Sequence, residues 1–579
     1  MKTLHTSRLL LISALLAVAG SAYGTQPPDV VSSDSNLNTA MGTDALLGLS
    51  GGSGNNTAAG DGALESNTTG AYNTAVGALA LELNTTSHGN AALGYDALYA
   101  NTTGSSNTAA GSGALSSNTT GNQNTASGNG SLSANTTGGN NTASGFNALF
   151  SNTTGSDNTA DGVNALSENT TGQYNTASGY AALSSNSTGN GNSALGYNAL
   201  TGNSTGTANT AVGAGALHAN STGNGNSATG DDALNLNTTG SLNTASGDDA
   251  LEVNTTGNYN TATGASALSD NTTGSDNTAS GYNALVNNTI GDYNTAAGYE
   301  SLFSNTGGNY NDASGYFALH NNTTGAQNSA SGVQALYGNK TGNYNTASGT
   351  DALYLNTTGS SNIAEGYKAG YNLTTGSNNI DIGNLGVAAE SGTIRIGTTS
   401  TQTATYIAGI YGTSVTGSAV VVSSTGQLGV TVSSERYKTK ITPMGSSSEK
   451  LQALRPVTFH LKTDPQGALQ YGLIAEEVAK VYPELVIRGE NGRIDGVRYD
   501  ELAPLLLNEV QRQRGTMTLQ AENIAAERER NATQAAEIRA LKQELSGHAE
   551  QLRDLRQQLA ELHAALPTQQ HKDEFVAQR

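Results

Sequence analysis

The sequence predicts a mainly β fold: a parallel β-roll solenoid of 17-residue repeats, then a small α/β domain and a C-terminal coiled coil. Three observations predict it. A glycine returns every 17 residues from Gly60 to Gly383, and a leucine follows the first 18 of these glycines by four positions. The composition changes abruptly at Ser433, and a heptad register can be held over residues 503–566. A short fixed period is the signature of a solenoid, whose units stack only on their neighbours.

The first 24 residues have the pattern of a secretory signal peptide. Lys2 and Arg8 precede the apolar run Leu9 to Ala19, and small residues end the segment at Ala22 and Gly24. About 11 apolar residues are fewer than the roughly 20 that span a bilayer. We therefore expect residues 1–24 to be removed, residues 25–37 to be a linker, and the mature protein to have no membrane-spanning segment. It is expected to be secreted or held at a bacterial cell surface.

Composition excludes several function classes. The chain has 579 residues, a net charge of -20, 12% charged residues and no cysteine. A nucleic-acid partner is not expected, because a phosphate backbone requires a basic face and no Lys/Arg stripe is present. Without cysteine there is neither a disulfide framework nor a thiolate metal site. We expect no cofactor and no metal.

The repeat region, residues 38–386, predicts a shaft of stacked coils. Its consensus is N-T-A-x-G-x-x-A-L-x-x-N-T-T-G-x-x, with short apolar pieces separated by turn-forming Asn and Gly. We expect two very short strands per coil, with equivalent Asn and Thr side chains forming ladders along the stack. Helix is disfavoured by the glycines and the β-branched threonines. At about 4.8 Å per coil, 20 coils would extend on the order of 95 Å.

Each coil offers few apolar side chains, mostly alanine and one leucine. Because this is little apolar surface to offset chain entropy, we expect several chains to share the core. The N-x-A-x-G step resembles the head region of trimeric autotransporter adhesins, whose repeats wind into trimeric β-rolls. The resemblance implies a homotrimer with a glycan or another cell-surface ligand, although the period here is longer and no membrane barrel follows.

Other interpretations of the repeat stay open. The N-T-T triplets match the acceptor pattern for N-glycosylation, but a turn that needs Asn and Thr produces the same match. Calcium-binding rolls need a regular Asp, which these repeats lack. Regular Thr arrays on a flat roll could order water at an ice surface. Recurrent tyrosines such as Tyr174 and Tyr259 could stack on sugars.

Residues 387–432 read as a β neck with glycine turns, and residues 433–511 as an ordinary α/β domain. The domain begins S-S-E-R-Y-K-T-K-I and continues through L-R-P-V-T-F-H-L-K and Y-G-L-I-A-E-E-V-A-K-V-Y-P-E-L-V. We expect a strand at 457–461 and a helix at 473–481. This block resembles the endosialidase-type intramolecular chaperone domain at the C-termini of phage tail fibres and spikes.

The resemblance implies an activity directed at the chain itself. In that family the domain assists trimerisation and then cuts itself off through a Ser-Lys dyad in an S-x-x-R-x-K motif. The matching positions are Ser433, Arg436 and Lys438. They imply catalytic roles for Ser433 and Lys438, a supporting role for Arg436, and cleavage between Val432 and Ser433. The family often has Asp after the serine, whereas this chain has Ser434.

The chemistry can be stated from the residues alone. A serine hydroxyl is a weak nucleophile until a base takes its proton, and a lysine serves only when desolvation or nearby cations favour its neutral form. Lys440 and Arg436 are the cations nearby in sequence. On a regular helix Ser433 and Lys438 would lie about 140° apart, so a loop or a contact across the trimer must join them. In the alternative interpretation, the serines cap the next segment and Lys438 is solvated.

The segment 503–566 predicts a trimeric coiled coil, and residues 567–579 a polar tail. The a positions are Ala503, Val510, Met517, Ile524, Asn531, Ile538, Leu545, Leu552, Leu559 and Leu566. Glutamines and Glu527 occupy d positions in the middle of the segment, so the seam is weak there. Asn531 is expected to fix the register, and His548 at a d position to loosen the seam at low pH.

Together these features predict an exported homotrimeric fibre with a self-cleaving C-terminal chaperone. The alternatives are a trimeric fibre that is not cleaved and a water- or ice-ordering repeat protein. A polysaccharide-degrading spike is disfavoured, because the shaft has no concentrated acidic cluster.

Overall fold

The computed structural model describes residues 32–50, 54–408, 410, 419–423, 425–489, 491–525 and 532–564. The predicted signal peptide and the polar tail lie outside these residues. The chain divides into two compact units, residues 1–413 and 414–579, which are described separately below.

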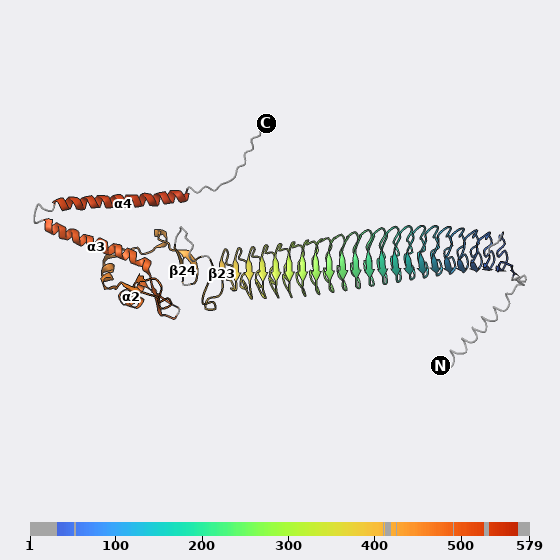
Figure 1. The fold of residues 1–579 in the computed structure, drawn as a ribbon, viewed down its shortest axis with the longest axis horizontal. Coiled ribbons are helices and arrows are strands. Elements are labelled where there is room, and N and C mark those ends of the chain that lie inside the picture. The colour runs from blue at the N-terminus through green and yellow to red at the C-terminus, as the bar shows by residue number, and fades with distance from the viewer. Residues whose placement is uncertain are drawn as a thin grey trace, which may run out of the picture. The chain divides into compact units, whose positions relative to one another are not determined.

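The first unit is a parallel β-solenoid of about 21 turns, which confirms the predicted fold class. Each coil contributes one short strand that pairs in parallel with the strand of the next coil, as Ala177 does with Ala194. Figure 1 shows these strands stacked side by side in chain order. β1 pairs antiparallel with β2, and the stack continues through β23 into the segment predicted as neck.

The strands of this unit are β1 Ser32–Ser33, β2 Thr39–Met41, β3 Thr57–Ala59, β4 Thr74–Val76, β5 Ala91–Leu93, β6 Thr108–Ala110, β7 Thr125–Ser127, β8 Thr142–Ser144, β9 Thr159–Asp161, β10 Thr176–Ser178, β11 Ser193–Leu195, β12 Thr210–Val212, β13 Ser227–Thr229, β14 Thr244–Ser246, β15 Thr261–Thr263, β16 Thr278–Ser280, β17 Thr295–Ala297, β18 Asp312–Ser314, β19 Ser329–Ser331, β20 Thr346–Ser348, β21 Ile363–Glu365, β22 Ile380–Ile382 and β23 Ile394–Ile396.

The prediction of a second strand in each coil was wrong, because the A-L step is a turn. Its leucine has a positive φ, as at Leu200 with φ 56° and Leu217 with φ 53°. Strand backbone requires a negative φ, and the left-handed region costs an L-residue roughly 1–2 kcal/mol. The conformation turns the leucine side chain inward, where it is fully buried. Burial of the leucine therefore outweighs the strain.

The core of the solenoid lies inside a single chain. In a typical coil the mid-strand Ala194 and the turn residues Ala199 and Leu200 are buried, and their equivalents recur along the stack. Our expectation of a core shared between chains was therefore wrong. The physical reason is that buried asparagine side chains fill the rest of the interior of each coil.

Two ladders of buried asparagines run along the solenoid. In the N-T-A ladder, Asn209 Nδ2 donates to Asn192 Oδ1 at 3.2 Å and to Gly223 O at 2.8 Å. In the N-T-T-G ladder, Asn203 Nδ2 donates to Asn186 Oδ1 at 2.7 Å. The predicted asparagine ladders are thus confirmed, and each satisfies polar groups that would be costly to bury unpaired. Because the N-T-T asparagines of this ladder are buried, the folded shaft does not present them for N-glycosylation.

The second unit contains a small mixed domain and two helices. Its elements are β24 Val420–Val422, β25 Leu428–Val430, η1 Glu435–Tyr437, η2 Gly445–Ala453, β26 Val457–Phe459, β27 Gln470–Gly472, α2 Ala475–Val481, η3 Pro483–Leu485, β28 Val486–Arg488, β29 Ile494–Val497, α3 Tyr499–Ala525 and α4 Ala532–Ala564, where η marks a 3-10 helix. The strands pair as antiparallel hairpins, β24 with β25, β26 with β27, and β28 with β29.

The buried core of this unit brings α2, the β28–β29 hairpin and the start of α3 together. It is formed by Val478, Tyr482, Leu485, Val486, Val497 and Leu505. Helices α3 and α4 occupy most of the segment predicted as coiled coil. Asn531, predicted to set the register, lies outside the described residues.

Candidate functional site

The candidate site lies where β25 leads into the single 3-10 turn η1. Tyr437 N donates to Ser434 O at 3.0 Å, and Lys438 N donates to Glu435 O at 2.9 Å, which closes the turn. Ser434 occupies the N-cap position of η1 but makes no side-chain capping hydrogen bond. The interpretation in which the serine hydroxyl caps the following segment therefore finds no support at Ser434.

The turn brings the two predicted catalytic side chains together. Lys438 Nζ donates to Ser433 Oγ at 3.2 Å. A regular helix would hold these residues apart, but here one tight turn is followed by extended backbone at Lys438, with φ -115° and ψ 142°. The prediction that a loop joins them within the chain is consistent with this geometry. The distance is at the outer limit of the reach expected between a nucleophile and its base.

The surroundings of the dyad are open to solvent. Ser433, Lys438 and the neighbouring Val432 are exposed, and 56% of Val432 is accessible. Arg436 stacks its guanidinium over the Tyr437 ring, 4.8 Å from the ring centre. Arg436 thus contacts Tyr437, and its supporting role in the dyad stays a prediction. Because Ser433 and Lys438 are both exposed, water reaches the predicted nucleophile and the predicted base in a single chain.

A polar network ties η2 to α3. Glu509 is buried and accepts hydrogen bonds from Arg512, Gln513 and Ser448, with distances of 2.9–3.1 Å. Charge-assisted hydrogen bonds from Arg512 lower the pKa of Glu509 to about 2, helped by the bonds from Gln513 and Ser448. We did not predict this residue from the sequence. Its signal is the spacing E-x-x-R-Q, which places Arg512 and Gln513 on the same side of a helix as Glu509.

A second link joins η2 to α2. Tyr482 at the end of α2 donates its hydroxyl to Ser447 O at 2.9 Å. Arg455, just after η2, binds Glu477 of α2 through two hydrogen bonds of 3.1 and 2.6 Å. These contacts anchor η2, the element that follows the dyad in the chain, to α2.

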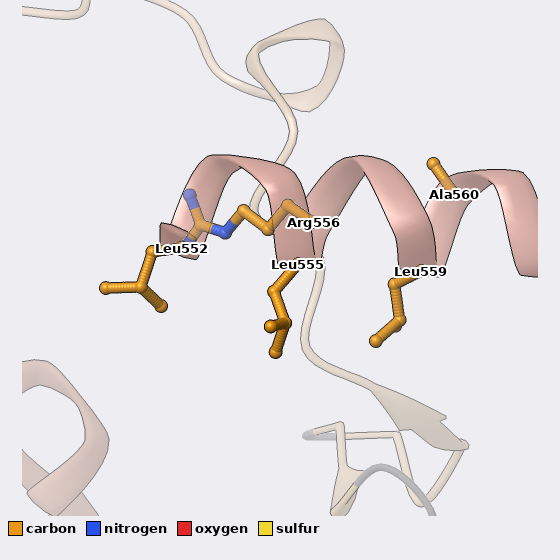
Figure 2. Close-up of a pocket in the computed structure, with 5 residues that line it drawn as sticks. All are labelled: Leu552, Leu555, Arg556, Leu559 and Ala560. Carbon is orange, nitrogen blue, oxygen red and sulfur yellow. The ribbon is translucent and has the colours of Figure 1, made fainter. Parts of the chain in front are cut away.

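Helix α4 presents an apolar stripe rather than a catalytic cleft. Figure 2 shows Leu555 and Leu559 projecting together from α4, with Ala560 on the opposite side. These residues, with Leu552 and Arg556, line a shallow hollow on the helix. The leucines occupy predicted a and d positions, and Leu562 is 74% exposed. The hollow therefore marks the seam face of the predicted coiled coil and lies apart in sequence from the dyad.

No helix among the placed segments is long and apolar enough to cross a membrane. In the same part of the chain, no group of three or more His, Asp or Glu side chains is arranged to hold a metal ion.

Comparison with known proteins identifies the C-terminal domain. No curated protein matches the chain. Residues 433–487 match the family model described as chaperone of endosialidase. The match begins at Ser433, the predicted nucleophile, and ends within β28, earlier than the boundary at 511 expected from the sequence. The predicted resemblance to this family is thereby confirmed for the C-terminal domain at residues 433–487.

Proposed function

We propose that this protein is an exported homotrimeric fibre whose C-terminal domain aligns three chains and then cleaves itself off between Val432 and Ser433. The hydrogen bond from Lys438 Nζ to Ser433 Oγ, at the first residue of the family match, carries the proposal. The matched family implies trimeric assembly, and the β-solenoid supplies the fibre. Enzymatic action is confined to the chain itself.

The proposed cleavage uses the serine next to the bond that breaks. Neutral Lys438 accepts the proton of Ser433 Oγ, and the oxygen attacks the carbonyl carbon of Val432. The C–N bond between the two residues breaks, and the nitrogen of Ser433 takes the proton back from Lys438. Water then hydrolyses the resulting ester, which leaves a carboxylate at Val432 and regenerates the serine.

Solvent exposure of the dyad supplies a reason for cleavage to follow assembly. A base must accept the serine proton, whereas Lys438 Nζ here donates to Ser433 Oγ. Cover from a neighbouring chain would remove water from Lys438 and favour its neutral form. The proposed order is therefore folding, trimerisation and then cleavage.

Register is the physical problem that such a chaperone solves. Each coil of the shaft pairs with the next through nearly the same residues, so a slip of one coil between chains would preserve most contacts. A unique globular domain at one end removes this degeneracy. The exposed leucine stripe of α4 supports the proposal, because three such stripes would bury one another in a coiled coil.

The proposed location is a bacterial surface or the extracellular medium, supported by the pattern of residues 1–24 and by the fibre-type chaperone family. A glycan or another cell-surface molecule is the proposed ligand of the shaft.

Intact mass spectrometry of the chain from residue 25 onward tests the cleavage. We expect a fragment that begins at Ser433 and ends at Arg579, and its absence in Ser433→Ala and in Lys438→Ala. Ser434→Ala is the matched control, because it removes the neighbouring hydroxyl and should still be cleaved. A full-length wild-type chain would refute autoproteolysis and leave the non-cleaving trimeric fibre.

A second candidate function rests on the outer face of the strands. From β6 to β10 the first residue of every strand is an exposed threonine, beginning with Thr108 and ending with Thr176. A regular threonine row of this kind favours ordering of water at an ice surface. Thermal hysteresis of the purified protein would support it, and its absence would exclude it.

A further inference from the structure

The outward face of the solenoid changes character in its last three strands. The first and third residues of each strand point outward, and from β6 to β20 they are mostly Thr, Ser and Ala. In β21, β22 and β23 these positions carry five isoleucines: Ile363, Ile380, Ile382, Ile394 and Ile396. Residues 38–362 contain a single isoleucine, Ile290. We name these five residues the isoleucine face.

The isoleucine face is contiguous. Ile380 lies directly beside Ile363 on one side and Ile394 on the other, and Ile382 lies beside Ile396. Glu365 is the one polar residue in this grid, and its carboxylate accepts a hydrogen bond from Ser348 Oγ at 3.1 Å.

The face is exposed in the single chain. Ile394 is 65% and Ile396 71% exposed. The nearby Arg395 is bound to Glu390 through hydrogen bonds of 2.7–3.0 Å, so this ion pair is satisfied within the chain. An apolar, β-branched surface whose one carboxylate is that of Glu365, at the end of an otherwise polar strand face, is typical of an interaction surface.

The chemistry of the face favours further copies of the same chain as its partner. A sugar would require hydrogen-bonding groups or aromatic rings, and isoleucine side chains offer neither. A symmetric assembly places the same patch of each subunit around the axis, where a largely apolar surface is complementary to itself. The matched family implies a trimer, and its domain follows this face in the chain.

We propose that the isoleucine face is where three chains contact one another at the C-terminal end of the shaft. The proposal rests on the proposed trimeric fibre and adds what holds it together once residues 433–579 have left. Burial of these side chains among three chains retains the trimer without the chaperone domain. The polar strand face upstream contributes little to the contact.

Single cysteines test the contact, because the chain has none of its own. Ile396→Cys in the chain from residue 25 onward, treated with a short bis-maleimide, should give a covalent dimer containing roughly two thirds of the chains, since a bifunctional reagent joins two of three subunits. Ser331→Cys is the matched control, because it is the exposed third residue of β19. It should remain monomeric on a denaturing gel. No dimer at position 396, or equal dimer at both positions, would overturn the proposal.

A second variant measures the retention of the trimer. The double variant Ile394→Ser with Ile396→Ser introduces serine at two outward positions. Other strands carry serine at the same positions, so the coil should still fold. Light scattering should give a trimeric cleaved shaft for wild type and a monomeric one for this variant, with the same cleavage by intact mass. A trimeric variant shaft would refute the inference. An uncleaved wild-type chain would instead refute autoproteolysis. The cross-linking result would then still show whether the isoleucine face forms the contact between chains.

Discussion

Asp381 is the residue whose replacement should most change the last coils of the shaft. It takes the mid-strand position that alanine holds in the preceding coils, and it pairs directly with Ala364. Its side chain is fully buried, and neither carboxylate oxygen has a hydrogen-bond partner. Burial raises its pKa to about 6, the charge of Glu390 adds to this effect, and Arg395 opposes it.

The sign and size of the effect follow from proton linkage. Because the folded-state pKa lies above the ordinary value of 3.8, the ionised carboxylate disfavours the folded coil. Stability is fully present at low pH and is lost as the pH rises through about 6. A shift from 3.8 to about 6 corresponds to about 3 kcal/mol at pH 8, and to about half of that at pH 5.

We therefore expect Asp381→Ala to stabilise the terminal coils, and more strongly at pH 8 than at pH 5. Native-state hydrogen exchange of the Ile380 and Gly383 amides is the assay, since end coils of a solenoid open locally. At each pH the variant is compared with wild type, and protection should rise by roughly 100-fold at pH 8 and tenfold at pH 5. Asp312→Thr, on the outward face of β18, is the control and should show no such difference.

Two results would refute this reasoning. An equal change in protection at both pH values would mean that packing, not ionisation, limits the terminal coils. A loss of protection at pH 8 would mean that Asp381 contributes a favourable interaction there.

Two further predictions concern buried polar groups, one in the shaft and one in the C-terminal domain. Asn209→Ala should destabilise the middle of the shaft by about 1–3 kcal/mol, because Asn226 N loses its acceptor, while Gly223 O and Asn226 Nδ2 each lose one of two partners; urea unfolding should show this loss and little change for the exposed Thr205→Ala. Below pH 4.5 the C-terminal domain should lose stability as Glu509 protonates toward its pKa of about 2, since its depressed pKa makes the ionised form favour folding. Glu509→Gln should flatten that pH dependence in thermal melts, and an unchanged profile would contradict the assigned role.

The dyad shows how far local sequence patterns extend. The family resemblance, through its S-x-x-R-x-K motif, pointed to Ser433 and Lys438, and the need for a loop or a contact across the trimer followed from helix geometry. The tight turn of η1 and the extended backbone at Lys438 bring the two side chains within hydrogen-bond distance. The hydrogen bond from Ser448 to Glu509 was not predicted, because the two residues lie 61 positions apart in the chain. No local pattern records such a contact.

The sequence by itself determined the period of the shaft, the parallel stacking of its coils and the ladders of identical side chains. These follow from repetition, because equivalent residues of stacked coils must lie beside one another. Only the tertiary structure decided that each coil has one strand, that one chain encloses the core, and that Asp381 is buried without a partner. Those outcomes depend on how a coil closes upon itself, where burial of Leu200 and hydrogen bonds between asparagines outweigh the local backbone preferences.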